Sequence, residues 1–324
     1  MKYTTLGNSG IRVSRICLGG LSFGRITPGG HQWLLDEEQC ADMIRHAFDL
    51  GINFIDTANK YADGTSEEYI GRALKRLGIP RRQVVLATKV YFNSSTPEHL
   101  TKKAILLEIE GSLRRLQTDY VDLYQVHRFD YDTPVEETME ALDSLIKAGK
   151  ARALGASSMY GYQFHNMQIA AEKNGWTPFC AMQNHYNLIY REDERELIPI
   201  CRQYGVSLIP YSPLASGHLA HAGWDSGTAR SRTDAVAAKK YDKTMEADLK
   251  VIDRVDELAR RYGVSMSRIA LGWLLKKGVA APIVGATKKA HFDDAAASAD
   301  FDLSDEDALY LEAPYQPHAV VGAL

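Results

Sequence analysis

Short apolar runs alternate with amphipathic segments along this chain, and this alternation restricts the folds open to it. The runs lie at residues 16–20, 53–58, 84–90, 121–127, 151–157, 181–186, 207–211 and 281–285. Most of them are continuously apolar rather than strictly alternating, which is typical of parallel strands whose sheet is covered on both faces. The sequence therefore predicts eight buried parallel strands.

Helical spacing of apolar residues fills the intervals between the runs. Helices are predicted at 36–50, 66–77, 101–116, 133–148, 160–174, 192–204, 246–262, 265–277, 288–299 and 304–312. Eight strands that each feed a helix predict an α/β fold of the (β/α)8 TIM-barrel type, with an extra helix before the last strand. Residues 3–6 and 11–13, joined by a turn at 7–10, add an N-terminal β-hairpin.

A doubly wound open sheet is the alternative fold, although a dinucleotide-binding sheet of that type carries a glycine-rich loop after its first strand and none follows residues 16–20. No linker divides the chain, so a single barrel domain over residues 1–324 is expected. The stretch 212–244 is irregular and longer than most loops in compact domains, so we expect it to have a function.

Composition narrows the classes of partner. The net charge of −3 gives no broad attraction to nucleic acid or to an anionic membrane surface. No apolar run is long enough to span a bilayer, and the N-terminal residues lack the apolar core of a signal peptide. The cysteines are scattered without metal-ligand or disulfide spacing, so we expect no metal site and a reducing, cytoplasmic location.

Ionisable side chains end three of the predicted strands. Asp56, Lys89 and His127 each close an apolar run, and Tyr61 follows Asp56 after a short interval. The C-terminal ends of barrel strands share one rim, and enzymes with this fold place their active sites there. The four side chains should therefore converge on that rim. A buried ionisable group is costly unless it is paired or used.

Together these residue types suit proton donation to a carbonyl oxygen. An ammonium near a tyrosine lowers the pKa of the hydroxyl, a carboxylate keeps the ammonium charged, and histidine hydrogen-bonds a polarised carbonyl. Since no side chain donates hydride, a nicotinamide cofactor is implied. Individually, Lys89 and Asp56 could form a structural ion pair, His127 could be a core histidine, and Tyr61 could be a packing residue.

The segments Gly51-Ile52-Asn53-Phe54-Ile55-Asp56-Thr57-Ala58 with Tyr61, Thr88-Lys89, and Gln125-Val126-His127 resemble the signature of the aldo-keto reductase family. The resemblance covers essentially the whole chain and is strongest to the bacterial and fungal branch of aryl-alcohol-dehydrogenase-like proteins. It implies that Tyr61 is the general acid, that Lys89 tunes the pKa of Tyr61, that Asp56 pairs with Lys89, and that His127 orients the carbonyl.

The same resemblance implies a cofactor site for NADP(H), with NAD(H) less favoured. Ser158 and Ala295 stand where many members carry asparagine, so two amide groups are missing from the usual pattern. The implied cofactor-binding residues are Gly20, Asp56, Ser157, Gln183, Tyr211, Ser212, Leu214, Ser216, Gly285, Thr287, Lys288, His291 and Asp294. Lys288 and Thr287 would meet the adenosine 2′-phosphate at a helix N-terminus, and Tyr211 would stack on the nicotinamide.

Four aromatic residues that follow strand ends, Phe23, Trp33, Tyr91 and Phe129, are candidate walls of the substrate pocket, with apolar packing as the alternative. Arg230 and Arg232 in the long loop could grip the pyrophosphate or face solvent. The expected partner is a small carbonyl compound, an aldehyde or also a ketone, which is reduced to the alcohol. A non-catalytic NADPH-binding regulatory subunit of the same fold is the alternative function, and a Schiff-base lyase that uses Lys89 is a further one. The sequence does not set the oligomeric state.

Overall fold

In the computed structural model, eight parallel strands form one sheet in the order β10-β3-β4-β5-β6-β7-β8-β9. The structure describes residues 1–28, 30–93, 95–225, 227 and 233–322. The strands are β3 (Cys17–Gly19), β4 (Phe54–Asp56), β5 (Val85–Val90), β6 (Val121–Val126), β7 (Ala151–Ser157), β8 (Phe179–Gln183), β9 (Ser207–Leu208) and β10 (Ile283–Val284). All eight lie within or overlap the predicted runs, and the α/β barrel class is confirmed.

Two backbone hydrogen bonds close the sheet into a ring. The Ala280 amide donates to the Leu208 carbonyl and the Ile283 amide donates to the Pro210 carbonyl, each at 2.9 Å, which joins the segments of β9 and β10. The open-sheet alternative is therefore wrong. Strands β9 and β10 are shorter than predicted, and Pro210 and Pro282 account for this because proline has no amide hydrogen for a sheet ladder.

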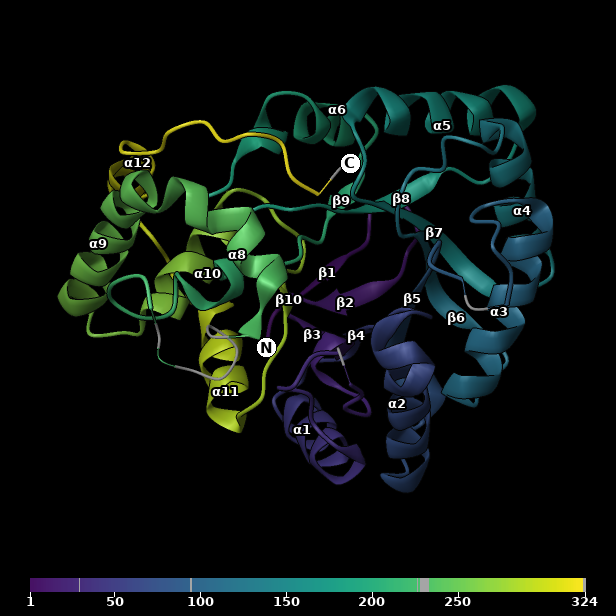
Figure 1. Cartoon of the computed structure of the whole chain (residues 1–324), viewed down its shortest axis with the longest axis horizontal. Coiled ribbons are helices and arrows are strands. Elements are labelled where there is room, and N and C mark those ends of the chain that lie inside the picture. The colour runs from purple at the N-terminus through teal and green to yellow at the C-terminus, as the bar shows by residue number, and fades with distance from the viewer. Residues whose placement is uncertain (29, 94, 226, 228–232, 323–324) are drawn as a thin grey trace.

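Helices ring the strands (Figure 1). Their bounds are α1 (Glu37–Asp49), α2 (Thr65–Arg76), α3 (Lys102–Leu116), α4 (Val135–Lys147), α5 (Gly161–Asn174), α6 (Leu197–Gln203), α8 (Ala235–Tyr241), α9 (Met245–Tyr262), α10 (Met266–Lys276), α11 (Lys289–Ser298) and α12 (Asp305–Glu312). Local signals fix several ends. Asp36 caps α1 through a capping box with Gln39, and Thr101 and Ser265 cap α3 and α10.

Two helix predictions need correction. The predicted helix 192–204 is divided into a short 3-10 turn, η4 (Glu192–Glu194), and α6. The stretch 212–244, which we expected to be irregular throughout, holds the 3-10 turn η5 (Ala215–Gly217), the helix α8 and the 3-10 turn η6 (Asp242–Thr244). Asp234 caps α8, because its side chain accepts a hydrogen bond from the Ala237 amide. This helix-start signal was not recognised in the sequence because the surrounding segment is rich in polar residues. Across the described residues, no helix has both the length and the apolar character needed to cross a membrane.

The barrel has two separate apolar cores. The larger one lies between the strands and the surrounding helices. The smaller one fills the barrel interior with inward-facing strand residues such as Phe54, Ala87, Leu123 and Ala181. Inward positions recur at every second residue of a strand, so the next inward residues toward the C-terminal rim are Asp56, Lys89, Gln125 and Gln183. The interior is therefore apolar at its base and polar at its rim.

An antiparallel hairpin of β1 (Tyr3–Thr5) and β2 (Arg12–Ser14) covers the base of the barrel. Its apolar residues Leu6, Ile11 and Val13 belong to the interior core. The turn itself touches the barrel at Gly7, whose amide donates to the Ser207 hydroxyl at 2.8 Å. Gly7 has a φ of +44°, and a Cβ there would lie 2.4 Å from the Cys180 carbonyl oxygen.

Substituting Gly7 by alanine is expected to destabilise the protein. A left-handed backbone costs a non-glycine residue about 1–2 kcal/mol, and the clash with the Cys180 carbonyl adds about 1–3 kcal/mol. Gly10 provides the matched control, because its φ is +71° but a Cβ there meets nothing within 4 Å. Denaturant unfolding should show a larger loss for Gly7→Ala than for Gly10→Ala, and equal losses would contradict the proposed contact.

Candidate active site

The polar rim is built from consecutive strand ends. Asp56 is the last residue of β4, Lys89 is the next-to-last residue of β5, and His127 follows β6 directly. Asp56 and Lys89 are buried, with relative exposures of 1% and 0%. Tyr61 begins the 3-10 turn η2 (Tyr61–Gly64) above the end of β4 and is half-buried. The structure thus brings all four predicted catalytic residues to one rim.

Lys89 links the other groups through its ammonium. Its Nζ donates to Asp56 Oδ1 at 2.5 Å and to the Thr57 carbonyl at 2.8 Å. The same Nζ lies 3.1 Å from the hydroxyl oxygen of Tyr61. A fully buried ammonium with three oxygen partners is satisfied, and the third of these partners is the tyrosine hydroxyl.

A tight left-handed turn fixes the position of Tyr61. Ala62, Asp63 and Gly64 follow it with φ values of +47°, +52° and +89°. Residues other than glycine enter this region at a cost, and such strain is common at functional sites. Thr65 supports the turn, because its hydroxyl donates to the Ala62 carbonyl at 2.7 Å.

Burial and charge act in opposition on Lys89 and Tyr61. Burial opposes the charged form of Lys89, but the Asp56 carboxylate and Tyr61 together raise the pKa of Lys89 above its ordinary value. Burial also raises the pKa of Tyr61, and Lys89 opposes that rise. Lys89 thus acts on the pKa of Tyr61 in the expected direction, but burial has the larger effect and the net pKa is raised. The hydroxyl therefore stays protonated at neutral pH.

His127 lies beside Tyr61 as a neutral imidazole. The two rings meet edge to face with centroids 5.8 Å apart. Burial and the charges of Lys89 and Arg128 hold the pKa of His127 well below its ordinary value. Its Nδ1 is buried and has no hydrogen-bond partner among the described residues. A neutral imidazole with spare hydrogen-bonding capacity can bind a carbonyl oxygen without adding charge.

Two glutamine amides complete the coordination of Asp56. The Nε2 atoms of Gln125 and Gln183 each donate to Asp56 Oδ2 at 2.9 Å. Gln183 was predicted to hold the nicotinamide carboxamide, and here it lies at the rim with its amide on Asp56. Gln125 lies in the segment that carries the family resemblance, but its contact with Asp56 was not predicted. The sequence feature that indicates this contact is its position two residues before His127, which places both side chains on the inward face of the same strand. Gly155 on β7 leaves room for the side chain, since a Cβ there would lie 2.9 Å from Gln125 Cγ.

The residues predicted to hold the nicotinamide lie at the C-terminal ends of β3, β7, β8 and β9. Ser157 is paired in register with Gln183, and a Cβ at Gly20 would lie 3.0 Å from the Asp56 carbonyl. The Tyr211 ring stacks on His185 with centroids 5.2 Å apart, and Lys240 Nζ lies 4.7 Å from the centre of the same ring. Ser212, Leu214 and Ser216 follow in a tight loop, in which Ser212 has a φ of +51° and Ser216 a φ of +58°.

The predicted phosphate-binding residues surround the N-terminus of α11. Gly285, Thr287, Lys288 and His291 are exposed. Lys288 is the N-cap residue of α11, with no side-chain cap bond, and a Cβ at Gly285 would meet nothing within 4 Å. Uncapped helix amides beside an exposed lysine fit a phosphate group.

Asp294, predicted to accept from the adenine amino group, is already engaged on both carboxylate oxygens. Ser265 donates to one of them, and Arg268 Nη2 donates to the other at 3.2 Å. An adenine contact would therefore require one of these bonds to be shared or replaced.

The predicted pocket walls differ in their surroundings. Phe23 has a relative exposure of 0% and packs in the larger core between the strands and the helices. Its prediction as a pocket wall is therefore wrong, and the alternative of apolar packing applies to it. Tyr91 stacks on His99 at 4.2 Å, Phe129 meets Tyr131 at 5.1 Å, and Trp33 meets His31 at 4.7 Å. Sequence reasoning missed Phe92, whose ring lies edge to face with His127 at 5.2 Å.

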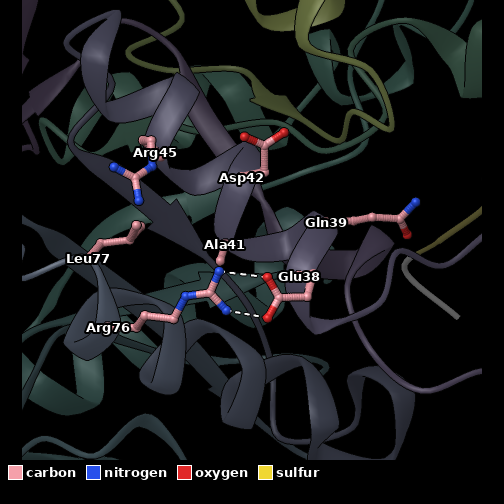
Figure 2. Close-up of a pocket in the computed structure, with 7 residues that line it drawn as sticks. All are labelled: Glu38, Gln39, Ala41, Asp42, Arg45, Arg76 and Leu77. Carbon is pink, nitrogen blue, oxygen red and sulfur yellow. Dashed lines mark hydrogen bonds and ion pairs between the residues drawn. The ribbon is translucent and has the colours of Figure 1, made fainter.

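Two surface cavities lie away from this rim. One, of 420 Å³, lies between α1 and α2 and is crossed by the Glu38–Arg76 ion pair (Figure 2). The other, of 490 Å³, lies at the base of the barrel beside the hairpin. Neither cavity is lined by a predicted site residue. The candidate active site is therefore the polar rim of the barrel and neither of these cavities. Arg230 and Arg232 lie outside the described residues.

Comparisons with known proteins agree with this geometry. The model of the aldo/keto reductase family matches residues 15–315. Versiconal hemiacetal acetate reductase from Aspergillus parasiticus is 42% identical, over 99% of this chain and 98% of the relative. Putative aryl-alcohol dehydrogenases from Schizosaccharomyces pombe and Saccharomyces cerevisiae are 41% and 36% identical, over 99% and 98% of this chain and 98% of each relative. The chain therefore belongs to the aldo/keto reductase family, and it is an oxidoreductase of carbonyl compounds.

Proposed function

We propose that this protein reduces aldehydes, and also ketones, to alcohols with NADPH, and that Tyr61 supplies the proton. The observation that carries the proposal is the chain of contacts from Asp56 Oδ1 to Lys89 Nζ at 2.5 Å and on to the Tyr61 hydroxyl at 3.1 Å. It ends beside the neutral ring of His127. When bound, the nicotinamide supplies the hydride.

The protein side of the reaction follows from these contacts. The Tyr61 hydroxyl and an N–H of His127 donate hydrogen bonds to the carbonyl oxygen, which polarises the carbonyl bond. As negative charge develops on that oxygen, Tyr61 transfers its proton. The Lys89 ammonium stabilises the resulting phenolate, and Asp56 keeps the ammonium charged and oriented. In alcohol oxidation the same groups act in reverse order.

The test is an absorbance assay of NADPH consumption with an aromatic aldehyde, preceded by a fluorescence titration of NADPH and of NADH. Binding of NADPH with turnover is the expected result. Turnover with a preference for NADH would keep the proton-donating roles and overturn the phosphate site. Tight NADPH binding without turnover on a broad aldehyde panel would favour the regulatory subunit instead.

Lys288 is expected to determine the preference for NADPH. Substituting it by alanine removes a positive charge at the N-terminus of α11, so NADPH should bind about tenfold more weakly, while NADH binding should not change. Lys289→Ala is the matched control, because Lys289 is paired with Asp42 at 2.7 Å. Equal weakening of NADPH in the two variants would contradict the role given to Lys288.

A further inference from the structure

Arg128 is a charged residue of the rim that the mechanism above does not use. It follows His127 immediately after β6 and is half-buried. Its Nη1 is buried without a hydrogen-bond partner, and no described residue forms an ion pair with it. A buried guanidinium N–H without an acceptor is costly, and such a group calls for an explanation.

Two carboxylates, that of Asp130 two residues after Arg128 and that of Asp56 at the rim, are already engaged by other groups. Asp130 accepts from the Leu100 amide at 2.9 Å, the Thr133 hydroxyl at 2.7 Å and the Asp132 amide at 3.0 Å. Asp56 is held by Lys89 and the two glutamine amides described above. Within the part of the chain that the structure describes, the charge of Arg128 therefore has no counter-ion at the rim of the barrel.

The charge of Arg128 acts on groups from several strand ends. After burial and Lys89, it contributes to the lowered pKa of His127. It also opposes the effect of burial on the pKa of Tyr61 and of Tyr211. These residues follow β4, β6 and β9, so the guanidinium lies close to the space that they enclose.

We infer that Arg128 binds an anionic substituent of the carbonyl substrate, and that the preferred substrates are aldehydes carrying a carboxylate. The inference rests on the proposed function. A guanidinium matches a carboxylate with two parallel hydrogen bonds. Because the charge of Arg128 acts on both His127 and Tyr61, the charged group of the substrate would lie near the reacting oxygen. Phe92, a residue that is 38% exposed and whose ring contacts His127, offers an apolar surface to the part of the substrate between the two groups.

The phosphate groups of the cofactor are less suitable partners for Arg128 than a carboxylate of the substrate. The exposed lysine and the helix N-terminus without a side-chain cap, which fit a phosphate, belong to α11 and follow β10. Arg128 follows β6, and β6 and β10 are not neighbours in the sheet. The residue is thus separated by several strands from the proposed phosphate site.

The experiment compares 4-carboxybenzaldehyde with its neutral methyl ester by the ratio of their kcat/KM values. The wild-type protein is expected to favour the carboxylate by about tenfold or more, and Arg128→Met should abolish that preference. Any effect of the substitution on His127 affects both aldehydes, so the ratio isolates recognition of the charge. Arg128→Lys should retain part of the preference, since it keeps the charge but loses the planar fork. Fluorescence titration with terephthalate in the presence of NADP⁺ gives a second readout that does not depend on turnover.

Arg82→Met is the matched control. Arg82 lines the cavity at the base of the barrel, so this variant loses the same charge far from the rim and should keep the preference of the wild type. Equal kcat/KM values for the two aldehydes in the wild-type protein would overturn the inference while leaving the reductase proposal intact. Weaker NADPH binding by Arg128→Met with unchanged aldehyde preference would assign Arg128 to the cofactor and would also overturn it. Absence of turnover with both aldehydes, together with no binding of terephthalate, would reject the reductase proposal and this inference together.

Discussion

Substituting Tyr61 by phenylalanine is expected to lower the rate of carbonyl reduction by about 10²–10⁴-fold while leaving NADPH binding nearly unchanged. The substitution removes only the hydroxyl, which lies 3.1 Å from Lys89 Nζ. The aromatic ring and its edge contact with His127 remain. The carbonyl oxygen then loses its proton donor, but the groups proposed to bind the cofactor are untouched. Steady-state rates and an NADPH fluorescence titration measure the two effects separately.

Tyr204→Phe is the control for this experiment, because Tyr204 bonds to His165 on the outside of the barrel and has no contact with the rim. It should reduce aldehydes at the wild-type rate. A parallel loss of NADPH binding and turnover in Tyr61→Phe would show that the residue supports the cofactor site rather than the proton transfer.

The protonation of Tyr61 also predicts the pH dependence of reduction. Burial raises the pKa of Tyr61 above its ordinary value, with Lys89 opposing the rise. Reduction requires the protonated hydroxyl, so the rate should be maintained through neutral pH and fall only as the pH rises past the ordinary tyrosine value of about 10. A pH profile of kcat/KM for the reduction checks this, and a loss of rate between neutral pH and that value would contradict it.

The fold was predictable from sequence because its main signals are local. Continuous apolar runs such as 84–90 and 121–127 define buried strands, and capped amphipathic segments such as 36–50 define the helices between them. Strand ends were harder to predict wherever proline interrupts the hydrogen-bond ladder, as at Pro210 and Pro282. Helix α8 was missed because it is only 7 residues long and most of its apolar residues are small alanines.

Within the candidate site, residues that end strands could be predicted, but the partners of their side chains could not. Asp56, Lys89 and His127 are inward-facing rim residues, and strand parity alone places them together. The contacts of Gln125 and Gln183 with Asp56 depend on how closely three alternate strands approach one another, which no single run of sequence encodes. Phe23 illustrates the converse error, because a position after a strand does not show which way its side chain packs.

Substituting Lys89 by methionine should abolish turnover and also destabilise the fold. Lys89 has a relative exposure of 0% and holds Asp56 at 2.5 Å. Removing one partner of a buried ion pair leaves an uncompensated charge and costs about 3–5 kcal/mol. Denaturant unfolding measures this loss, and an NADPH-consumption assay measures turnover. A Lys89→Met variant as stable as the wild type would show that Asp56 does not depend on the ammonium.

The double variant Lys89→Met, Asp56→Asn separates the two roles of the pair. Neutralising the carboxylate removes the unpaired charge, so most of the lost stability should return, whereas turnover should not, because Tyr61 still lacks its ammonium. The pH dependence of stability gives an independent check. Since the pKa of Lys89 is raised in the folded protein, its stabilising contribution is fully present below the unfolded value of about 10.4 and is lost as the pH rises through the folded value. The stability difference between the wild-type protein and Lys89→Met should therefore hold from neutral pH to about pH 10 and shrink only above it. Recovery of turnover in the double variant would instead mean that the pair is structural and that Tyr61 donates its proton without help from Lys89.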